Sequence, residues 1–67
     1  MTDIELGKNL KKARNNANLT QAQVAEKVGI HVNFYARIER GEADASLETM
    51  KEILKALKIK SSEVFPF

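Results

Sequence analysis

The sequence predicts an all-α fold, a compact bundle of five short helices in one domain that spans residues 1–67. Apolar residues make up 43% of the chain, which is enough for one small core. They recur at helical spacing, and no segment shows the alternation that is typical of a strand. Gly, Ser and Thr stand where these helical patterns would begin and end. Together these three observations favour helices joined by short loops.

The first two helices are expected before Gly29. Apolar residues form an irregular helical stripe over residues 4–17, and that helix should fade near Asn16. Thr20 is typical of the residue that caps a helix start, so it predicts a second helix over residues 21–28. Gly29 suits the left-handed backbone that ends such a helix.

The third helix should run from about Val32 to Arg40 and end at Gly41 through the same left-handed conformation. Ser46 is the expected cap of the fourth helix, whose apolar residues give the clearest amphipathic pattern in the chain. A fifth helical turn should begin at Ser61 or Ser62. The side chains expected in the core are Val24, Val28, Ile38, Leu47, Ile53, Leu54, Leu57 and Val64, with Tyr35 in the core and its hydroxyl at the rim.

Composition argues against several classes of function. The chain has no cysteine and a single histidine, so it offers neither a disulfide nor a zinc site of the usual kind. It has no glycine-rich phosphate loop, and neither catalysis nor a cofactor is expected. No apolar run reaches the roughly 18 residues of a membrane helix, and no signal peptide is evident. We therefore expect a cytoplasmic protein with no membrane contact and no small-molecule ligand.

The third helix carries its polar residues on one side. On a helical wheel, one arc holds Phe34, Ile38, His31 and Tyr35, and the opposite arc holds Val32, Ala36, Arg40, Asn33 and Arg37. The second arc suits the major groove of DNA, because Arg pairs with guanine, Asn with adenine, and Val or Ala with the thymine methyl. A solvated helix surface has the same residue types. The place of this helix in an angled pair over about residues 20–41 favours the DNA interpretation.

A series of short matches to one family runs along the chain. They are Arg14, Leu19-Thr20-Gln21, Val24-Ala25, Gly29-Ile30, Ile38-Glu39-Arg40-Gly41, Ser46-Leu47-Glu48-Thr49, Ala56-Leu57-Lys58-Ile59 and Glu63-Val64-Phe65. In these residues the chain resembles the Cro and cI type helix-turn-helix regulators, also called the XRE family. That family includes the lambda-repressor-like DNA-binding domains of phages and the controller proteins of restriction–modification systems. The matches cover roughly residues 6–65, and they are specific through their order and spacing rather than singly.

The resemblance implies a role for each of several residues. Those that would face base edges in the major groove are His31, Val32, Asn33 and Arg37. Those that would hold phosphates are Arg14, Thr20, Gln21 and Arg40; for Thr20 and Gln21 the free amides at a helix start support this independently. Arg14 would also pair with Glu39.

The resemblance further implies a sequence-specific regulator of transcription that binds double-stranded DNA. Such proteins usually act as homodimers on palindromic operators, in a bacterial or phage-encoded setting. The last segment forms the dimer interface in several relatives, which makes Val64, Phe65 and Phe67 the candidates here.

Three positions depart from the family pattern. The loop Glu42-Ala43-Asp44 is acidic where relatives often carry basic or small residues, so it should repel phosphate. Ala45 stands where proline is frequent. His31 stands where Ser or Thr usually caps the reading helix, and it either contacts DNA or only covers the helix start. The acidic loop and the net charge of only +2 favour an alternative, a protein-binding helical module that is antitoxin-like or no longer binds DNA.

Overall fold

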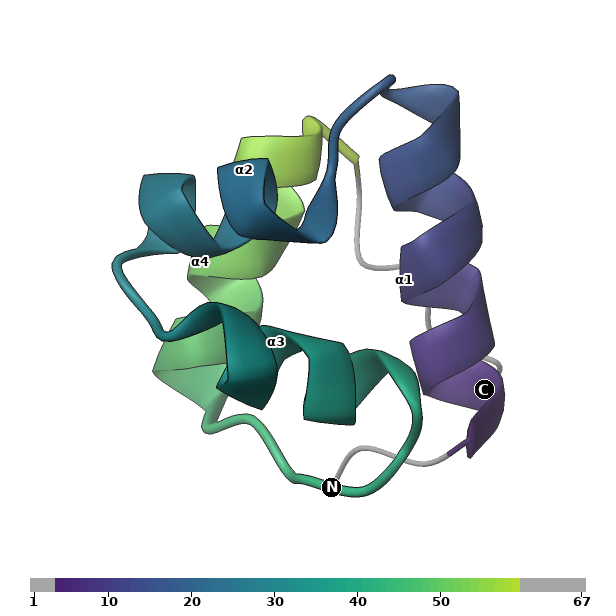
Figure 1. The fold of residues 1–67 in the computed structure, drawn as a ribbon, viewed down its shortest axis with the longest axis vertical. Helices are drawn as coiled ribbons and strands as arrows, with labels where there is room; N and C mark the ends of the chain where they lie inside the picture. The colour runs from purple at the N-terminus through teal and green to yellow at the C-terminus, as the bar shows by residue number, and fades with distance from the viewer. Residues whose placement is uncertain (1–3, 60–67) are drawn as a thin grey trace.

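The computed structural model describes residues 4–59, and these form helices and no strand (Figure 1). The helices are α1 (Ile4–Asn16), α2 (Gln21–Val28), α3 (Val32–Glu39) and α4 (Leu47–Leu57). The expected all-α fold is confirmed, with element bounds close to those expected. The fifth helical turn falls outside the described residues, so the count of five remains a prediction.

A single core lies between the helices. α2 packs against both α3 and α4, and α1 packs against α3. The buried apolar side chains come from all of these elements: Leu6, Leu10, Val24, Ala25, Tyr35, Ile38, Met50, Ile53 and Leu57. The core therefore supports α3 through α1 on one side and α2 on another.

Local capping fixes the position of α2 relative to α3. The backbone N–H of Gln23 donates to Oγ1 of Thr20 at 3.1 Å, and the backbone N–H of Thr20 donates to Oε1 of Gln23 at 2.8 Å. At the other end Gly29 has a φ of 85°, and its N–H donates to the carbonyl of Ala25. Only residues 29–31 separate the two helices, so α3 begins directly after this turn. The expected caps at Thr20 and Gly29 are confirmed.

The backbones of α1 and α3 approach each other at Gly7, a buried residue in the first half of α1. A Cβ atom at this position would collide with the backbone carbonyls of Ile38 and Glu39. The absence of a side chain at Gly7 therefore allows α1 to lie directly on the last turn of α3.

One expected core residue lies at the surface. Leu47 is 72% exposed, although it was expected in the core, and Ile4 is also exposed. Each is the first residue of its helix, and side chains there lean toward the helix start, away from the packed turns. Val28 and Leu54 are half-buried, while Val64 falls outside the described residues.

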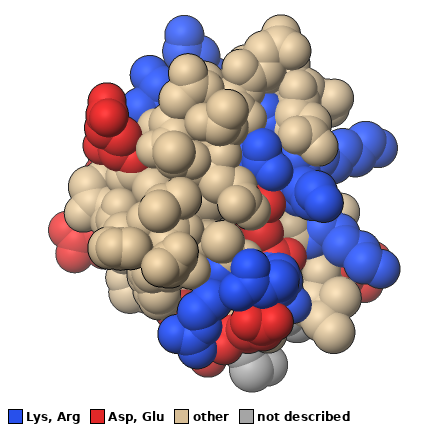
Figure 2. All heavy atoms as spheres, viewed as in Figure 1, with Lys and Arg blue, Asp and Glu red and all other residues tan. Residues whose placement is uncertain are grey.

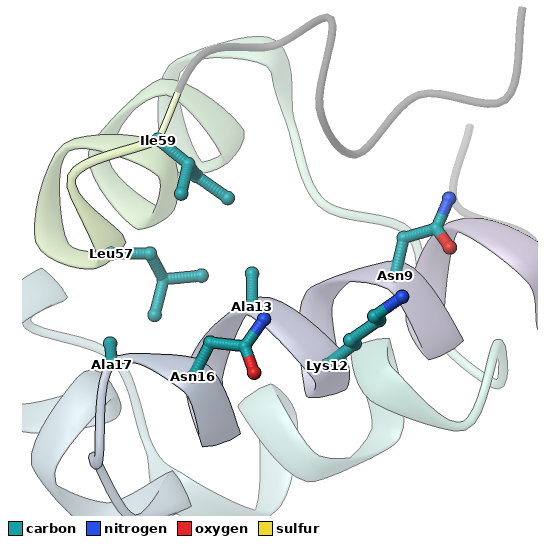
Figure 3. Close-up of a pocket in the computed structure, with 7 residues that line it drawn as sticks. All are labelled: Asn9, Lys12, Ala13, Asn16, Ala17, Leu57 and Ile59. Atoms are coloured by element: carbon teal, nitrogen blue, oxygen red, sulfur yellow. The ribbon is translucent and has the colours of Figure 1, made fainter.

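An open hollow lies between the second half of α1 and the end of α4 (Figure 3). Asn9, Lys12 and Asn16 of α1 line one side, and Leu57 and Ile59 line the other. It is separate from the exposed face of α3.

None of the helices within residues 4–59 combines the length and the apolar character that a membrane span requires.

Candidate nucleic-acid interface

The α3 helix has one buried and one exposed face. Tyr35, Ile38 and Glu39 point into the molecule and are buried. The exposed residues at its start and along its outer face are His31, Val32, Asn33, Arg37 and Arg40. All four residues expected to face bases thus lie at the surface, three in α3 and His31 at its start. The wheel had placed His31 on the core side, and that is wrong because His31 precedes the first helical turn.

His31 caps the start of α3. Its Nδ1 accepts a hydrogen bond from the backbone N–H of Asn33 at 3.1 Å. A ring nitrogen that accepts carries no proton, so the ring proton of the neutral imidazole lies on Nε2. His31 therefore takes the capping role usual for Ser or Thr, while Nε2–H is a donor that a DNA acceptor could engage.

A buried ion pair joins α1 to the last turn of α3. Arg14 Nε lies 2.7 Å from Glu39 Oε2, and Arg14 Nη2 donates to Glu39 Oε1 at 3.2 Å. The two side chains are 11% and 2% exposed. Arg14 Nη1 also donates to the carbonyl of Leu19 at 2.9 Å, which ties the α1–α2 loop to the same group. The pair implied by the resemblance is present.

Gln21 and Tyr35 extend this network. Gln21 Nε2 donates to Glu39 Oε1 at 3.0 Å, which links the first turn of α2 to α3. Burial alone would raise the pKa of Glu39, but hydrogen bonds from Arg14 and Gln21 outweigh it, and the pKa lies below its ordinary value. The network therefore holds Glu39 ionised inside the protein.

The Tyr35 hydroxyl lies inside the molecule and not at the rim, which corrects the sequence expectation. No side chain among residues 4–59 completes a well-oriented hydrogen bond to it. Burial raises the pKa of Tyr35, and the neighbouring Glu39 carboxylate raises it further. Tyr35 is thus a neutral side chain beside the ion pair.

An open groove runs beside α3 and brings together residues that the sequence treated separately. Its lining includes Thr20 and Gln21 at the start of α2 and Val32 at the start of α3. Asn15 and Asn18, from the end of α1 and the following turn, line it as well. Asn15 and Asn18 were not among the residues expected at this surface, although the asparagines before Thr20 are visible in the sequence. An anion in this groove would meet amide donors and the free N–H groups of a helix start.

The exposed arginines at the far end of α3 are not isolated. Arg40 Nε lies 3.1 Å from Glu42 Oε2, and both side chains are 55% exposed. Arg37 Nη2 donates to the backbone carbonyl of Glu42 at 3.3 Å. The hydrogen bond from Arg40, with the charges of Arg40 and Arg37, lowers the pKa of Glu42. Figure 2 shows cationic and acidic side chains side by side over this end of α3.

The described part of the chain holds no cluster of three or more His, Asp or Glu residues suited to a metal ion. The chemistry available at the surface of α3 is therefore hydrogen bonding and charge: one imidazole, amides, guanidinium groups and helix-start N–H groups. These groups recognise anions and base edges.

Comparison with known proteins gives a consistent result. The chain is 36% identical over 61 residues to the immunity repressor protein of Bacillus phage phi105, covering 91% of this chain and 42% of that protein. It is 38% identical over 52 residues to control protein C.SmaI of Serratia marcescens, covering 78% of this chain and 62% of the relative. The chain thus spans only part of the length of these relatives.

Among solved structures, the restriction–modification controller protein C.AhdI of Aeromonas hydrophila superposes with a TM-score of 0.88 and 27% sequence identity. The match covers 92% of this chain and 94% of that one. The model of the helix-turn-helix family matches residues 10–64, which include α2, α3 and α4. This chain therefore belongs to the helix-turn-helix family, as its resemblance to the Cro and cI type regulators implied.

Proposed function

We propose that this protein is a sequence-specific regulator of transcription that binds double-stranded DNA with α3 in the major groove. The observation that carries the proposal is the division of α3 into two faces. Val32, Asn33 and Arg37 are exposed on a helix whose other face is fixed by the core and by a buried ion pair. A helix held in this way can present side chains to base edges without rearranging.

The proposed base-reading residues are His31, Val32, Asn33 and Arg37. Arg37 would bind guanine, Asn33 adenine, and Val32 the methyl group of thymine. His31 would contribute Nε2–H while its Nδ1 keeps the cap.

The proposed phosphate contacts come from the start of α2 and from the residue after α3. Thr20 and the N–H groups at the start of α2 line the groove, with Asn15 and Asn18 beside them. Arg40 directly follows α3. Arg14 also lines this groove, so it stays a candidate for a phosphate contact, although its guanidinium already binds Glu39 and Leu19. Gln21 would contribute its backbone N–H, since its amide donates to Glu39.

We further propose that the protein binds a palindromic operator as a homodimer, in the cytoplasm of a bacterium or as a phage product. The phage and bacterial relatives support this setting. The candidate interface residues Val64, Phe65 and Phe67 fall outside the described residues and stay candidates. The final described residue, Ile59, lines the hollow between α1 and α4, separate from the proposed base-reading face.

The first test is selection of bound duplexes from a random pool. Recovery of an inverted repeat is expected, and it would give the target and the symmetry together. Binding should also weaken steeply between about 50 and 200 mM salt, because each phosphate contact releases a counterion. A protein-binding module, the alternative, would select no sequence and would show no such salt dependence.

The second test is Arg37→Ala on the selected duplex. We expect a loss of about 1–3 kcal/mol in binding free energy and relaxed choice at one base pair. Lys51→Ala, an exposed cation on α4, is the matched control and should bind as the unaltered protein does. A uniform loss on all sequences would instead assign Arg37 to the DNA backbone.

A further inference from the structure

We propose that Glu42 is an intramolecular competitor of DNA: its carboxylate occupies Arg40 in the free protein, and a DNA phosphate must displace it. This inference rests on the proposed function, because it concerns the same surface. It gives the acidic loop a specific role, the ion pair between Glu42 and Arg40, in place of a general repulsion of phosphate.

The geometry places Glu42 against both exposed arginines at the end of α3. Its Oε2 lies 3.1 Å from Arg40 Nε, and its backbone carbonyl accepts from Arg37 Nη2 at 3.3 Å. The turn that follows α3 fixes this position. The backbone N–H of Glu42 donates to the carbonyl of Arg37 at 2.8 Å, and Gly41 adopts a φ of 74°. The turn thus fixes the backbone of Glu42 at a position from which its carboxylate reaches Arg40.

The exposure of the pair makes it suited to exchange. An ion pair between exposed side chains is weak, because water screens both charges, so a phosphate can replace the carboxylate. A phosphate that does so still has to meet the cost of freeing Arg40. Binding to DNA of arbitrary sequence depends on phosphate contacts alone. The affinity for such DNA is therefore lower than it would be without the Glu42 carboxylate.

The competitor also changes the salt dependence of binding. When Arg40 moves to a phosphate, its exposed pair with Glu42 is broken, and salt screens and weakens that pair. Higher salt therefore makes the carboxylate easier to displace. The salt dependence of the unaltered protein should be shallower than that of a variant without this carboxylate.

The test measures affinity for a random-sequence duplex of about 20 base pairs at low salt, where binding rests on phosphate contacts. Glu42→Gln should bind about two- to fivefold more tightly, the equivalent of one exposed ion pair. Glu52→Gln is the matched control, since it removes the same charge from another exposed pair, with Lys55 on α4. That control should change affinity by less than the Glu42 variant does.

A double-mutant comparison separates competition for Arg40 from simple repulsion. In an Arg40→Gln background the carboxylate has lost its partner, so Glu42→Gln should give no further gain. A gain of the same size in both backgrounds would mean that Glu42 only repels phosphate, and it would overturn the proposal. An unchanged affinity of Glu42→Gln would overturn it equally.

The result also distinguishes this inference from the function on which it rests. If the unaltered protein binds duplexes but Glu42→Gln shows no gain, the competitor proposal fails and the proposed function stands. If neither the unaltered protein nor any variant binds a duplex at low salt, both proposals fail. Unfolding curves of each variant establish that the compared proteins are folded.

Discussion

Two arginine–glutamate pairs lie at the same end of α3, and they differ in their surroundings. Arg14 and Glu39 are 11% and 2% exposed, and they join α1 to α3 together with Gln21 and Leu19. Arg40 and Glu42 are both 55% exposed and join α3 only to the loop that follows it. The atoms in contact are the same kinds of atoms at similar distances.

The difference teaches that burial decides what such a pair does. Removing one partner of a buried pair leaves a charge that water cannot reach, so the protein loses stability. Removing one partner of an exposed pair leaves a charge in water, free for another partner. Glu39 therefore joins α3 to the rest of the fold, while Glu42 is the proposed competitor of DNA for Arg40.

The largest expected effect comes from breaking the buried pair. Glu39→Ala should lower the free energy of unfolding by about 3–5 kcal/mol, because Arg14 stays buried without its carboxylate. Urea unfolding followed by circular dichroism measures it. Replacing both partners, as Arg14→Leu with Glu39→Met, should recover much of the loss. A loss of less than about 1 kcal/mol in unfolding free energy for Glu39→Ala would mean that the buried pair contributes no more than an exposed pair does.

The next prediction tests whether the backbone contact at Gly7 also positions α3, in addition to the buried ion pair. Gly7→Ala should lower the free energy of unfolding by about 1–3 kcal/mol, because the added Cβ collides with the backbone carbonyls of Ile38 and Glu39. Lys8→Ala, at the exposed neighbouring position, is the control in the same measurement. Greater stability of Gly7→Ala, as glycine replacement usually gives in a helix, would show that the backbones do not approach as described.

Acid should weaken the buried pair. The pKa of Glu39 is lower in the folded protein than its ordinary value of 4.5, so Glu39 stabilises the fold above that pH. This contribution is lost as the pH falls through the folded-state pKa. The difference in unfolding free energy between the unaltered protein and Glu39→Gln should therefore narrow below about pH 4.5. A difference that stays constant down to the acid limit of folding would contradict the assignment.

The smallest expected effect on stability comes from breaking the exposed pair. Glu42→Gln should leave the unfolding midpoint unchanged, because the pair with Arg40 is exposed to solvent. Thermal unfolding measures the midpoint of this variant and that of Glu39→Gln, which has the same chemical change at the buried pair. A clear loss of stability in the Glu42 variant would mean that the loop after α3 contributes to holding the helix.

The features that were predicted correctly depend on interactions between residues close together in the sequence. The caps at Thr20, Gly29 and Ser46 depend on residues a few positions away, and all three are present. The pattern in α4 correctly predicted Ile53 and Leu57 as core residues, because their spacing fixes one face of a helix.

The errors and omissions depend on position at a helix start or on contacts between distant segments. Leu47 is exposed because it is the first residue of α4, which its apolar pattern does not distinguish from the later turns. The close approach of Gly7 to Ile38 and Glu39 was not predicted, because those residues are distant in the sequence. The sequence showed that the loop after Gly41 is acidic, but not that Glu42 lies against Arg40. Its effect was therefore predicted as diffuse repulsion, and the structure gives it a partner.

The separation of the two faces of α3 has a practical consequence for engineering. Val32, Asn33 and Arg37 are exposed, so combinations of other residues at these positions should leave the interior unchanged. A library randomised at these positions would then retain folded members in large proportion. From it, variants with new target preferences could be isolated without first repairing the scaffold.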